Sequence, residues 1–479
     1  MVRAQNISHS IQALQLYWPT KENGDPTGMM YASDWIMFQN LYSTLVELSS
    51  SKTVRPALAE RWTQSADGKH WIFYFRKNLR WSDNTPLTTE QIVQSLKRTA
   101  KGTYHTKFNA YVESIRASSD TQVEMQLKEK APRNFLILLA FVDSSILHPK
   151  AYASGKFNWY VPNNGPFRIE FYSNTEIKLT ANPHYWDNTK DRIQHATLTK
   201  VATGNPQKVI KMLLDSHTDA TAIDAGIIQN FSQVEELKKK YDVYIGNPEF
   251  LFNFNFSKKR TKEGKLNLVF RQYLLKEIYN RFWKADHNNT FRASGLRFHH
   301  LRGALSIAQL DEILAKLPDL FNKKVFPKSL EILVRERTKE KPIAIRMLQM
   351  VRELGFTVKE ITLNAEEHSK RFQSGDFDLE LISSGATEDD PDTAWRFYNN
   401  SLAEPVATTE ELDQAQLEGD PLKRNQMYQS FERKALEQAL FIPIKYEPTY
   451  IVTSKRVILD SQLAADWGLQ LFKLRMRQN

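Results

Sequence analysis

The chain has 479 residues, of which 41% are apolar, so it is long enough to form at least two lobes, each around its own core. Its formal net charge is +10, but Lys and Arg are spread along the chain without a basic block, which argues against a nucleic-acid partner. The absence of Cys excludes disulfides, zinc–thiolate sites, iron–sulfur clusters and cysteine nucleophiles.

The N-terminal sequence and the apolar runs bear on the cellular compartment. The first residues, MVRAQNISHS, lack the apolar stretch of a signal peptide. The longest apolar run, residues 135–147, contains Asp143 and is shorter than the roughly 18 to 20 residues that cross a bilayer. We therefore expect a soluble protein that is either cytoplasmic or a mature extracytoplasmic form with an added start Met.

Residues 41–98 predict several scaffold elements in close succession. Trp71, Phe73 and Phe75 alternate with residues of the opposite face, as in a half-buried strand, and the turn at residues 67–68 precedes them. Thr88 and Gln91 form a capping box for a helix that follows. The aromatic side chains of this segment are expected to pack in a core rather than to contact a ligand: Trp62, Trp71, Phe75 and Trp81.

The rest of the chain alternates strands and helices in an α/β manner. A helix is expected after Asn205-Pro206, and Ser306 with Gln309 forms a second capping box. Residues 251–256 alternate Phe with Asn, which predicts a strand with one packed and one polar face. A further helix ends at Gly355 and is followed by a strand over residues 356–363.

Six ordered motifs in residues 41–98 resemble those of one protein family. They are LYxxL at 41–45, PALAExW at 56–62, DGK at 67–69, FRKxL at 75–79, WSDxTPLT at 81–88 and SLKR at 95–98. Together they resemble the peptide-binding class of ABC-transporter solute receptors, the family 5 extracellular solute-binding proteins. NGPF at 164–167, NPxYW at 182–186, LGFxV at 354–358 and GDFDL at 375–379 extend the resemblance.

The resemblance implies an α/β, two-lobed, periplasmic-binding-protein-like (type II) fold with an extra subdomain inserted in lobe I. Lobe I would comprise residues 1–41, the inserted subdomain 42–159, residues 160–250 and the C-terminal part 447–479, with lobe II at 251–446. Residues 251–256 and 442–446 would be hinge-crossing strands. The match is weaker at residues 269–281, where the spacing of Arg271 and Arg281 survives but the small Ala positions of the family do not.

The resemblance also implies a function. The chain would capture a peptide or peptide-like solute between its lobes by hinge closure and deliver it to ABC permease subunits at the inner membrane. It would act as a periplasmic or extracytoplasmic monomer, without a cofactor and without enzymatic activity. The alternative is a ligand-sensing or regulatory protein that uses the same fold without transport.

No catalytic or metal motif competes with this interpretation. G-x-S-x-G, P-loop, dinucleotide-binding and H-E-x-x-H patterns are all absent. His299 and His300 are adjacent, and adjacent residues of a helix or strand rarely converge on one ion, so no metal site is expected. The same segment carries Arg292, Arg297 and Arg302. Arg297 is our candidate for a ligand carboxylate because guanidinium groups bind both carboxylate oxygens, and the alternative is that these residues form a surface cluster.

The sharper candidate is the loop that follows the strand at residues 377–382. Residues 383–393, SSGATEDDPDT, resemble the family's GWxADYxDPxxF loop, whose aspartate pairs with the α-ammonium group of a peptide. Here Thr387 takes the position of that aspartate and Ser384 that of the Trp. Glu388 or Asp389 would then hold the ammonium, or the ligand lacks a free amine there, or these acids are solvated. Other candidates to line the site are Ser383, Gly385, Asn253, Trp395, Tyr398 and Tyr446, with core packing an equal possibility for Trp395.

Overall fold

A computed structural model divides the chain into two compact units, residues 1–247 with 449–479 and residues 248–448. It describes residues 9–15, 32–49, 53–99, 111–131, 135–151, 158–189, 191–201, 206–215, 217–285, 291–297, 303–318, 325–385, 391–459 and 469–477. Within these residues, no helix is long and apolar enough to cross a bilayer.

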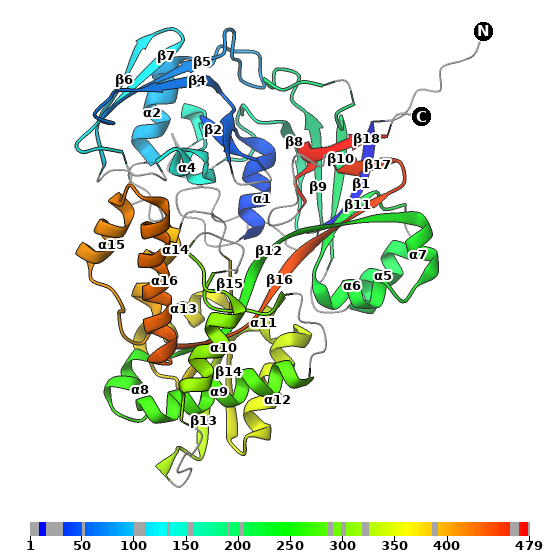
Figure 1. Cartoon of the computed structure of the whole chain (residues 1–479). Helices are drawn as coiled ribbons and strands as arrows, with labels where there is room; N and C mark the ends of the chain where they lie inside the picture. Colours follow the sequence, from blue (N-terminus) through cyan, green and yellow to red (C-terminus); the bar gives the residue numbers. More distant parts are fainter. Residues whose placement is uncertain are drawn as a thin grey trace. The chain divides into compact units, whose positions relative to one another are not determined.

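Two long strands, β12 (Tyr241–Phe256) and β16 (Phe441–Ser454), connect the two units. They are neighbours in one sheet, and Figure 1 shows them running alongside each other. The residues predicted as hinge crossings, 251–256 and 442–446, lie within these two strands.

Unit 1 contains one part of this large sheet, in the order β16-β11-β1-β10-β9-β8. Strand β1 pairs in parallel with β10 and β11, whereas β9 is antiparallel to β10 and β8. Alternating side chains of these strands, among them Ile11, Leu179 and Leu198, are buried in one core. The elements are β1 (Ser10–Gln15), α1 (Ala32–Leu41), β8 (Phe167–Tyr172), β9 (Glu176–Ala181), β10 (His195–Lys200), α5 (Pro206–Asp215), β11 (Ala220–Ile223), α6 (Ala225–Phe231) and α7 (Glu235–Lys240).

Unit 1 also contains a separate antiparallel sheet, β4-β5-β7-β6, which is covered by helix α2. The capping box predicted for this helix is confirmed, since Gln91 N donates to Thr88 Oγ1 at 3.3 Å and Thr88 N donates to Gln91 Oε1 at 3.1 Å. The four aromatic residues predicted as scaffold all pack in this core. The elements are β2 (Val46–Leu48), β3 (Val54–Pro56), β4 (Ala59–Gln64), β5 (His70–Phe75), α2 (Thr89–Thr99), β6 (Val112–Ser119), β7 (Gln122–Leu127), α4 (Phe135–Ala140), η2 (Val142–Ser144) and η3 (Pro149–Ala151).

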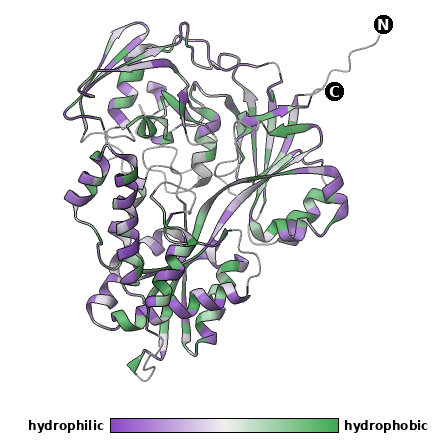
Figure 2. Cartoon of the chain, in the orientation of Figure 1, coloured by the Kyte–Doolittle hydropathy of each residue, from purple (hydrophilic) through white to green (hydrophobic). Residues whose placement is uncertain are grey.

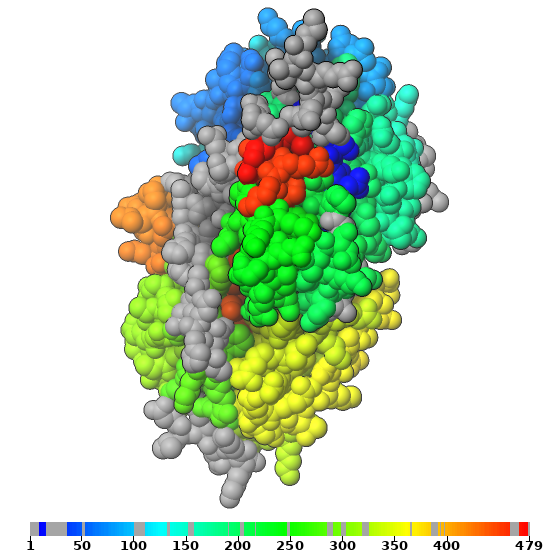
Figure 3. All heavy atoms as spheres, turned by 90° about the vertical axis from the view of Figure 1, so that its right-hand side faces the viewer, coloured from blue at the N-terminus to red at the C-terminus, as the bar shows by residue number. Residues whose placement is uncertain are grey.

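A buried carboxylate attaches the C-terminal end of the chain to the N-terminal strand. Both oxygens of Asp219 accept from Arg456 at 2.5 Å, and Gln12 N and Ser454 Oγ add bonds of 2.9 and 3.0 Å. Figure 3 shows the C-terminal residues (red) on the surface next to the N-terminal strand (blue). The C-terminal elements are β17 (Val457–Leu459), η7 (Leu471–Lys473) and β18 (Leu474–Met476).

Unit 2 contains the other part of the large sheet, in the order β14-β13-β15-β12-β16, with β13 parallel to both β14 and β15. The second predicted capping box, of Ser306 and Gln309, is confirmed at the start of α10. Figure 2 shows hydrophilic and hydrophobic residues interleaved along the helices, as expected for helices with one buried face. The elements are α8 (Lys258–Lys262), α9 (Leu268–Ala285), α10 (Ile307–Lys316), β13 (Ser329–Arg335), α11 (Glu336–Lys339), α12 (Pro342–Glu353), β14 (Thr357–Leu363), α13 (Ala365–Ser374), β15 (Leu379–Gly385), α14 (Pro391–Ser401), α15 (Thr409–Leu417) and α16 (Pro421–Glu437).

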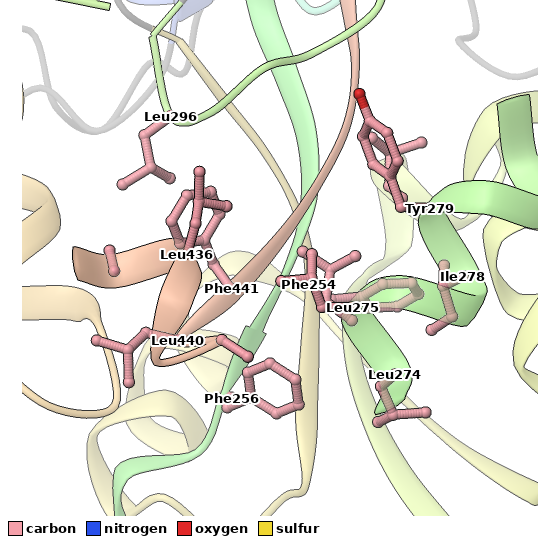
Figure 4. Close-up of a cluster of buried hydrophobic side chains, with 14 of the residues drawn as sticks. Phe254, Phe256, Leu274, Leu275, Ile278, Tyr279, Leu296, Leu436, Leu440 and Phe441 are labelled. Atoms are coloured by element: carbon pink, nitrogen blue, oxygen red, sulfur yellow. The ribbon is translucent and has the colours of Figure 1, made fainter. Parts of the chain in front are cut away.

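The two faces of β12 differ in chemistry. Phe252, Phe254 and Phe256 are at most 2% exposed and pack in the unit 2 core. In Figure 4, Phe254 and Phe256 lie among leucine and isoleucine side chains of α9 and the apolar residues that follow α16. On the opposite face, Asn253 and Asn255 are also buried, at 1% and 8% exposed. The predicted polar face therefore lies in the protein interior, where amide groups need hydrogen-bond partners.

Candidate ligand-binding residues in unit 2

A chain of side-chain hydrogen bonds extends along the polar face of β12. Asn253 Nδ2 donates to Asn255 Oδ1 at 2.7 Å, and Asn255 Nδ2 donates to Glu380 Oε2 at 2.9 Å. Asn255 and Glu380 are direct cross-strand partners on antiparallel β12 and β15, which places both side chains on the same face. Glu380 is 2% exposed, so its carboxyl group depends on these protein contacts.

Beyond Glu380, a histidine and an arginine make longer polar contacts. His368 Nε2, on α13, lies 3.5 Å from Glu380 Oε1, and Arg335 Nε donates to His368 Nδ1 at 3.5 Å. Burial raises the pKa of Glu380 to about 7, against the opposing effects of Asn255 and Arg335. Burial and the charge of Arg335 lower the pKa of His368 to about 4. At neutral pH the imidazole is therefore uncharged, and because Nδ1 accepts from Arg335, its proton is on Nε2 and faces Glu380.

The three predicted residues at the end of β15 lie on different faces. Ser384 pairs with Leu251 and Gly385 with Phe250, while Ser383 pairs with Phe252. Since successive strand residues alternate, Ser384 shares the face of Asn253, and Ser383 shares the face of the phenylalanines. Ser384 Oγ is buried and has no hydrogen-bond partner among the residues that the structure describes.

A second buried carboxylate, Glu432 on α16, holds the segment that contains Arg297. Glu432 Oε1 accepts from Leu296 N at 2.6 Å and from Arg297 N at 3.3 Å, and Oε2 accepts from Leu305 N at 3.0 Å. One carboxyl group thus binds the backbone on both sides of residues 298–302. Burial raises the pKa of Glu432 to about 7, although these N–H groups and the charge of Arg297 act in the opposite direction.

The segment around Arg297 is packed too tightly for a side chain at residue 295. A Cβ added to Gly295 would lie 2.2 Å from Glu432 Oε1, closer than any real contact. Tyr446 Oη donates to Gly295 O at 3.1 Å, and burial raises the pKa of this hydroxyl well above its ordinary value. The side chains of Arg297 and Tyr446 are 0% and 1% exposed, so the structure places both in the interior near Glu432.

Trp395 and Tyr398 lie on α14 and belong to the core of unit 2. Trp395 is 0% exposed, and its ring lies 6.0 Å from that of Phe431 in an edge-on arrangement. The same helix carries Asp392, which accepts from Arg396 Nε at 2.9 Å and from Tyr428 Oη at 3.1 Å. Trp395 thus packs in the core, while its buried Nε1 has no hydrogen-bond partner among the described residues.

Several predicted residues lie outside the described part of the chain. They are Thr387, Glu388 and Asp389 of the anchor loop, and His299, His300 and Arg302. Arg292 is described, and it has structural partners: its Nε donates to Tyr279 Oη at 2.8 Å, and its Nη atoms bind Asp311. Among the described residues, no group of three or more His, Asp and Glu side chains could hold a metal ion.

Sequence reasoning missed the buried carboxylates of Glu380 and Glu432. Glu380 did carry a signal, because it is the only charged residue in the apolar run of residues 379–382, where a buried charge requires a partner. Glu432 had none, since charged residues surround it on an ordinary amphipathic helix and its backbone partners are more than 120 residues away.

Residues 53–278 match the family model described as bacterial extracellular solute-binding proteins, family 5 middle. The chain is 24% identical over 457 residues to the protein named "Probable deoxycholate-binding periplasmic protein YgiS" of Escherichia coli, covering 85% of this chain and 83% of that protein. It is 28% identical over 226 residues to the periplasmic oligopeptide-binding protein OppA of Salmonella typhimurium, covering 42% of this chain and 39% of OppA.

The fold agrees with the sequence relationship. Haemophilus influenzae OppA, solved in complex with the peptide RPPGFSPFR, superimposes with a TM-score of 0.78 over 98% of this chain and 99% of OppA, at 17% identity. The predicted α/β fold of two-lobed periplasmic binding proteins is therefore confirmed. Through residues 53–278 the chain matches the family 5 bacterial extracellular solute-binding proteins, and its relatives and its fold agree with that match.

Proposed function

We propose that this protein captures a peptide or peptide-like solute and delivers it to the permease subunits of an ABC transporter. The observation that carries the proposal is the sequence relationship, which spans 85% of the chain in one relative and includes an oligopeptide-binding protein in another. Four of the described candidate residues, Asn253, Arg297, Ser384 and Tyr446, belong to unit 2 and offer an amide, two hydroxyls and a cation suited to peptide groups.

In this proposal the protein is a periplasmic or extracytoplasmic monomer and returns its ligand unaltered. The relatives are named as binding proteins, and two of them as periplasmic, which supports both points. Incubation of the ligand with stoichiometric protein, followed by mass spectrometry, should return the ligand intact. Cleavage that a point mutation abolishes would contradict the proposal.

Ligand capture is tested by thermal shift against a peptide library and deoxycholate. A ligand at about 100 times its Kd stabilises the folded state by about 2.7 kcal/mol and raises the melting temperature. Small-angle scattering should show compaction on binding if hinge closure completes the site. A screen in which deoxycholate alone stabilises the protein would overturn the assignment to peptides, and hits without compaction would count against closure.

The alternative function for the same fold is that of a ligand-sensing or regulatory protein that takes no part in transport. Reconstitution with the candidate permease and ATPase in proteoliposomes separates the two readings. Transport requires ligand-dependent stimulation of ATP hydrolysis, whereas a sensor leaves the ATPase unaffected.

A further inference from the structure

The buried hydrogen-bond chain on β12 has a direction. An ionised carboxylate only accepts hydrogen bonds, so Glu380 requires the NH₂ group of Asn255. The Oδ1 atom of Asn255 is then left to accept from the NH₂ group of Asn253. The orientation of both amides therefore follows from one buried charge.

This hydrogen-bond chain ends at an acceptor atom that receives no hydrogen bond from the described residues. Asn253 is 1% exposed, and its Oδ1 has no hydrogen-bond partner among the described residues. Buried polar atoms in folded proteins nearly always have a partner, and those that lack one need an explanation. Ser384 Oγ, on the same face and also buried without a partner in the described part of the chain, adds a second unsatisfied group.

We propose that Asn253 Oδ1 accepts a hydrogen bond from an N–H group of the ligand, and that Glu380 orients Asn253 for this role through Asn255. The proposal rests on the proposed function and assigns ligand contact to Asn253 and positioning roles to Asn255 and Glu380. The ligand group is an N–H donor, either a peptide ammonium or an amide.

The charge of Glu380 connects this acceptor to pH. When Glu380 is protonated it can donate to Asn255, the two amides can reverse, and Asn253 then presents its NH₂ group in place of Oδ1. The groups that face Glu380 are His368 from α13, Asn255 from β12 and, beyond His368, Arg335 from the end of β13. Because the pKa of His368 is lowered to about 4, this imidazole stays uncharged between pH 6 and 8, whereas Glu380, with a pKa raised to about 7, titrates in this range.

The test uses tripeptide pools with free and with acetylated N-termini. Native mass spectrometry identifies the peptide that the wild-type protein retains best, and calorimetry measures its affinity for variants between pH 6 and 8. Asn253→Ala should weaken binding by about 10- to 100-fold, since a buried ligand donor loses its partner. Glu380→Gln, which keeps the side-chain shape, should abolish the rise in affinity that the wild-type protein shows from pH 6 to 8.

Glu331→Gln is the matched control. Glu331 lies on the neighbouring strand β13, its carboxylate pairs with Lys359 at the surface, and the substitution should leave affinity and pH profile unchanged. If acetylation of the peptide weakens its binding to the wild-type protein but not to Asn253→Ala, the ligand donor is the ammonium group. If the wild-type protein binds free and acetylated peptides with equal affinity, the donor is an amide. Wild-type affinity in Asn253→Ala, or an unchanged pH profile in Glu380→Gln, overturns the proposal while the proposed function stands. A wild-type protein that retains no peptide from either pool overturns both.

Discussion

The contact between Gly295 and Glu432 gives the sharpest test of how unit 2 holds the segment of Arg297. In Gly295→Ala the new methyl group would lie 2.2 Å from Glu432 Oε1 and 2.4 Å from Cδ. The carboxyl group must then move and give up its bonds to the N–H groups of Leu296, Arg297 and Leu305. Losing hydrogen bonds to a buried charged group costs about 1.5 to 3 kcal/mol each, and these losses are not additive, so we expect about 3 to 5 kcal/mol.

Urea unfolding, followed by tryptophan fluorescence, measures this loss, and hydrogen exchange at the Leu296 and Leu305 amides localises it. Gly419→Ala is the matched control because an added Cβ there meets no atom within 4 Å, and its effect should stay within about 0.5 kcal/mol. In a Glu432→Ala background, Gly295→Ala should cost less than about 1 kcal/mol because the obstructing group is gone.

Two outcomes would refute this reasoning. Gly295→Ala could unfold at the same urea concentration as Gly419→Ala, which would mean that the backbone moves at little cost. Alternatively, the cost of Gly295→Ala could be the same with and without Glu432, which would show that another contact is responsible.

Three further predictions concern the other charged groups. Burial raises the pKa of Glu380 from 4.5 to about 7, so the stability that its protonated form contributes is present below pH 4.5 and is lost as pH rises through 7. The free energy of unfolding of the wild type, relative to that of Glu380→Gln, should therefore fall by about 3 kcal/mol from pH 4.5 to 8. A difference that stays constant with pH would contradict the buried charge. In unit 1, Asp219→Ala should cost about 2 to 4 kcal/mol because it removes the carboxylate that accepts from Arg456, Gln12 N and Ser454 Oγ. Arg477→Ala, which removes an exposed pair with Asp242, should cost less than about 0.5 kcal/mol, and equal melting temperatures of the two variants would refute the difference. In the anchor loop of residues 383–393, Glu388→Gln or Asp389→Asn should weaken binding of a free-amine peptide by about 2 to 5 kcal/mol if the substituted residue holds the ammonium. If that residue is solvated, the loss should be less than about 1 kcal/mol. Calorimetry with the free and the acetylated ligand measures the difference.

Local signals in the sequence were sufficient for the elements and the family. The capping boxes at Thr88–Gln91 and Ser306–Gln309 formed as predicted, because a cap depends only on residues three positions apart. The alternation of Phe and Asn over residues 251–256 predicted a two-faced strand, because successive side chains of a strand point to opposite sides. The ordered motifs identified the family for the same reason, since each consists of neighbouring residues.

The environment of each candidate residue was decided by tertiary structure alone. The sequence shows that Asn253 and Asn255 form a polar strand face, but not whether that face is exposed or buried. The pairing of β12 with β15 and the packing of His368 bury this face and place Glu380 where it accepts a hydrogen bond from Asn255. Likewise, the sequence offered Arg297 as a candidate for a ligand carboxylate, and the fold brings Glu432 to its backbone from 135 positions away. Burial, and the pKa of a buried acid, depend on which distant segments exclude water; the apolar run around Glu380 indicated that this acid needs a partner, but not which residue supplies it.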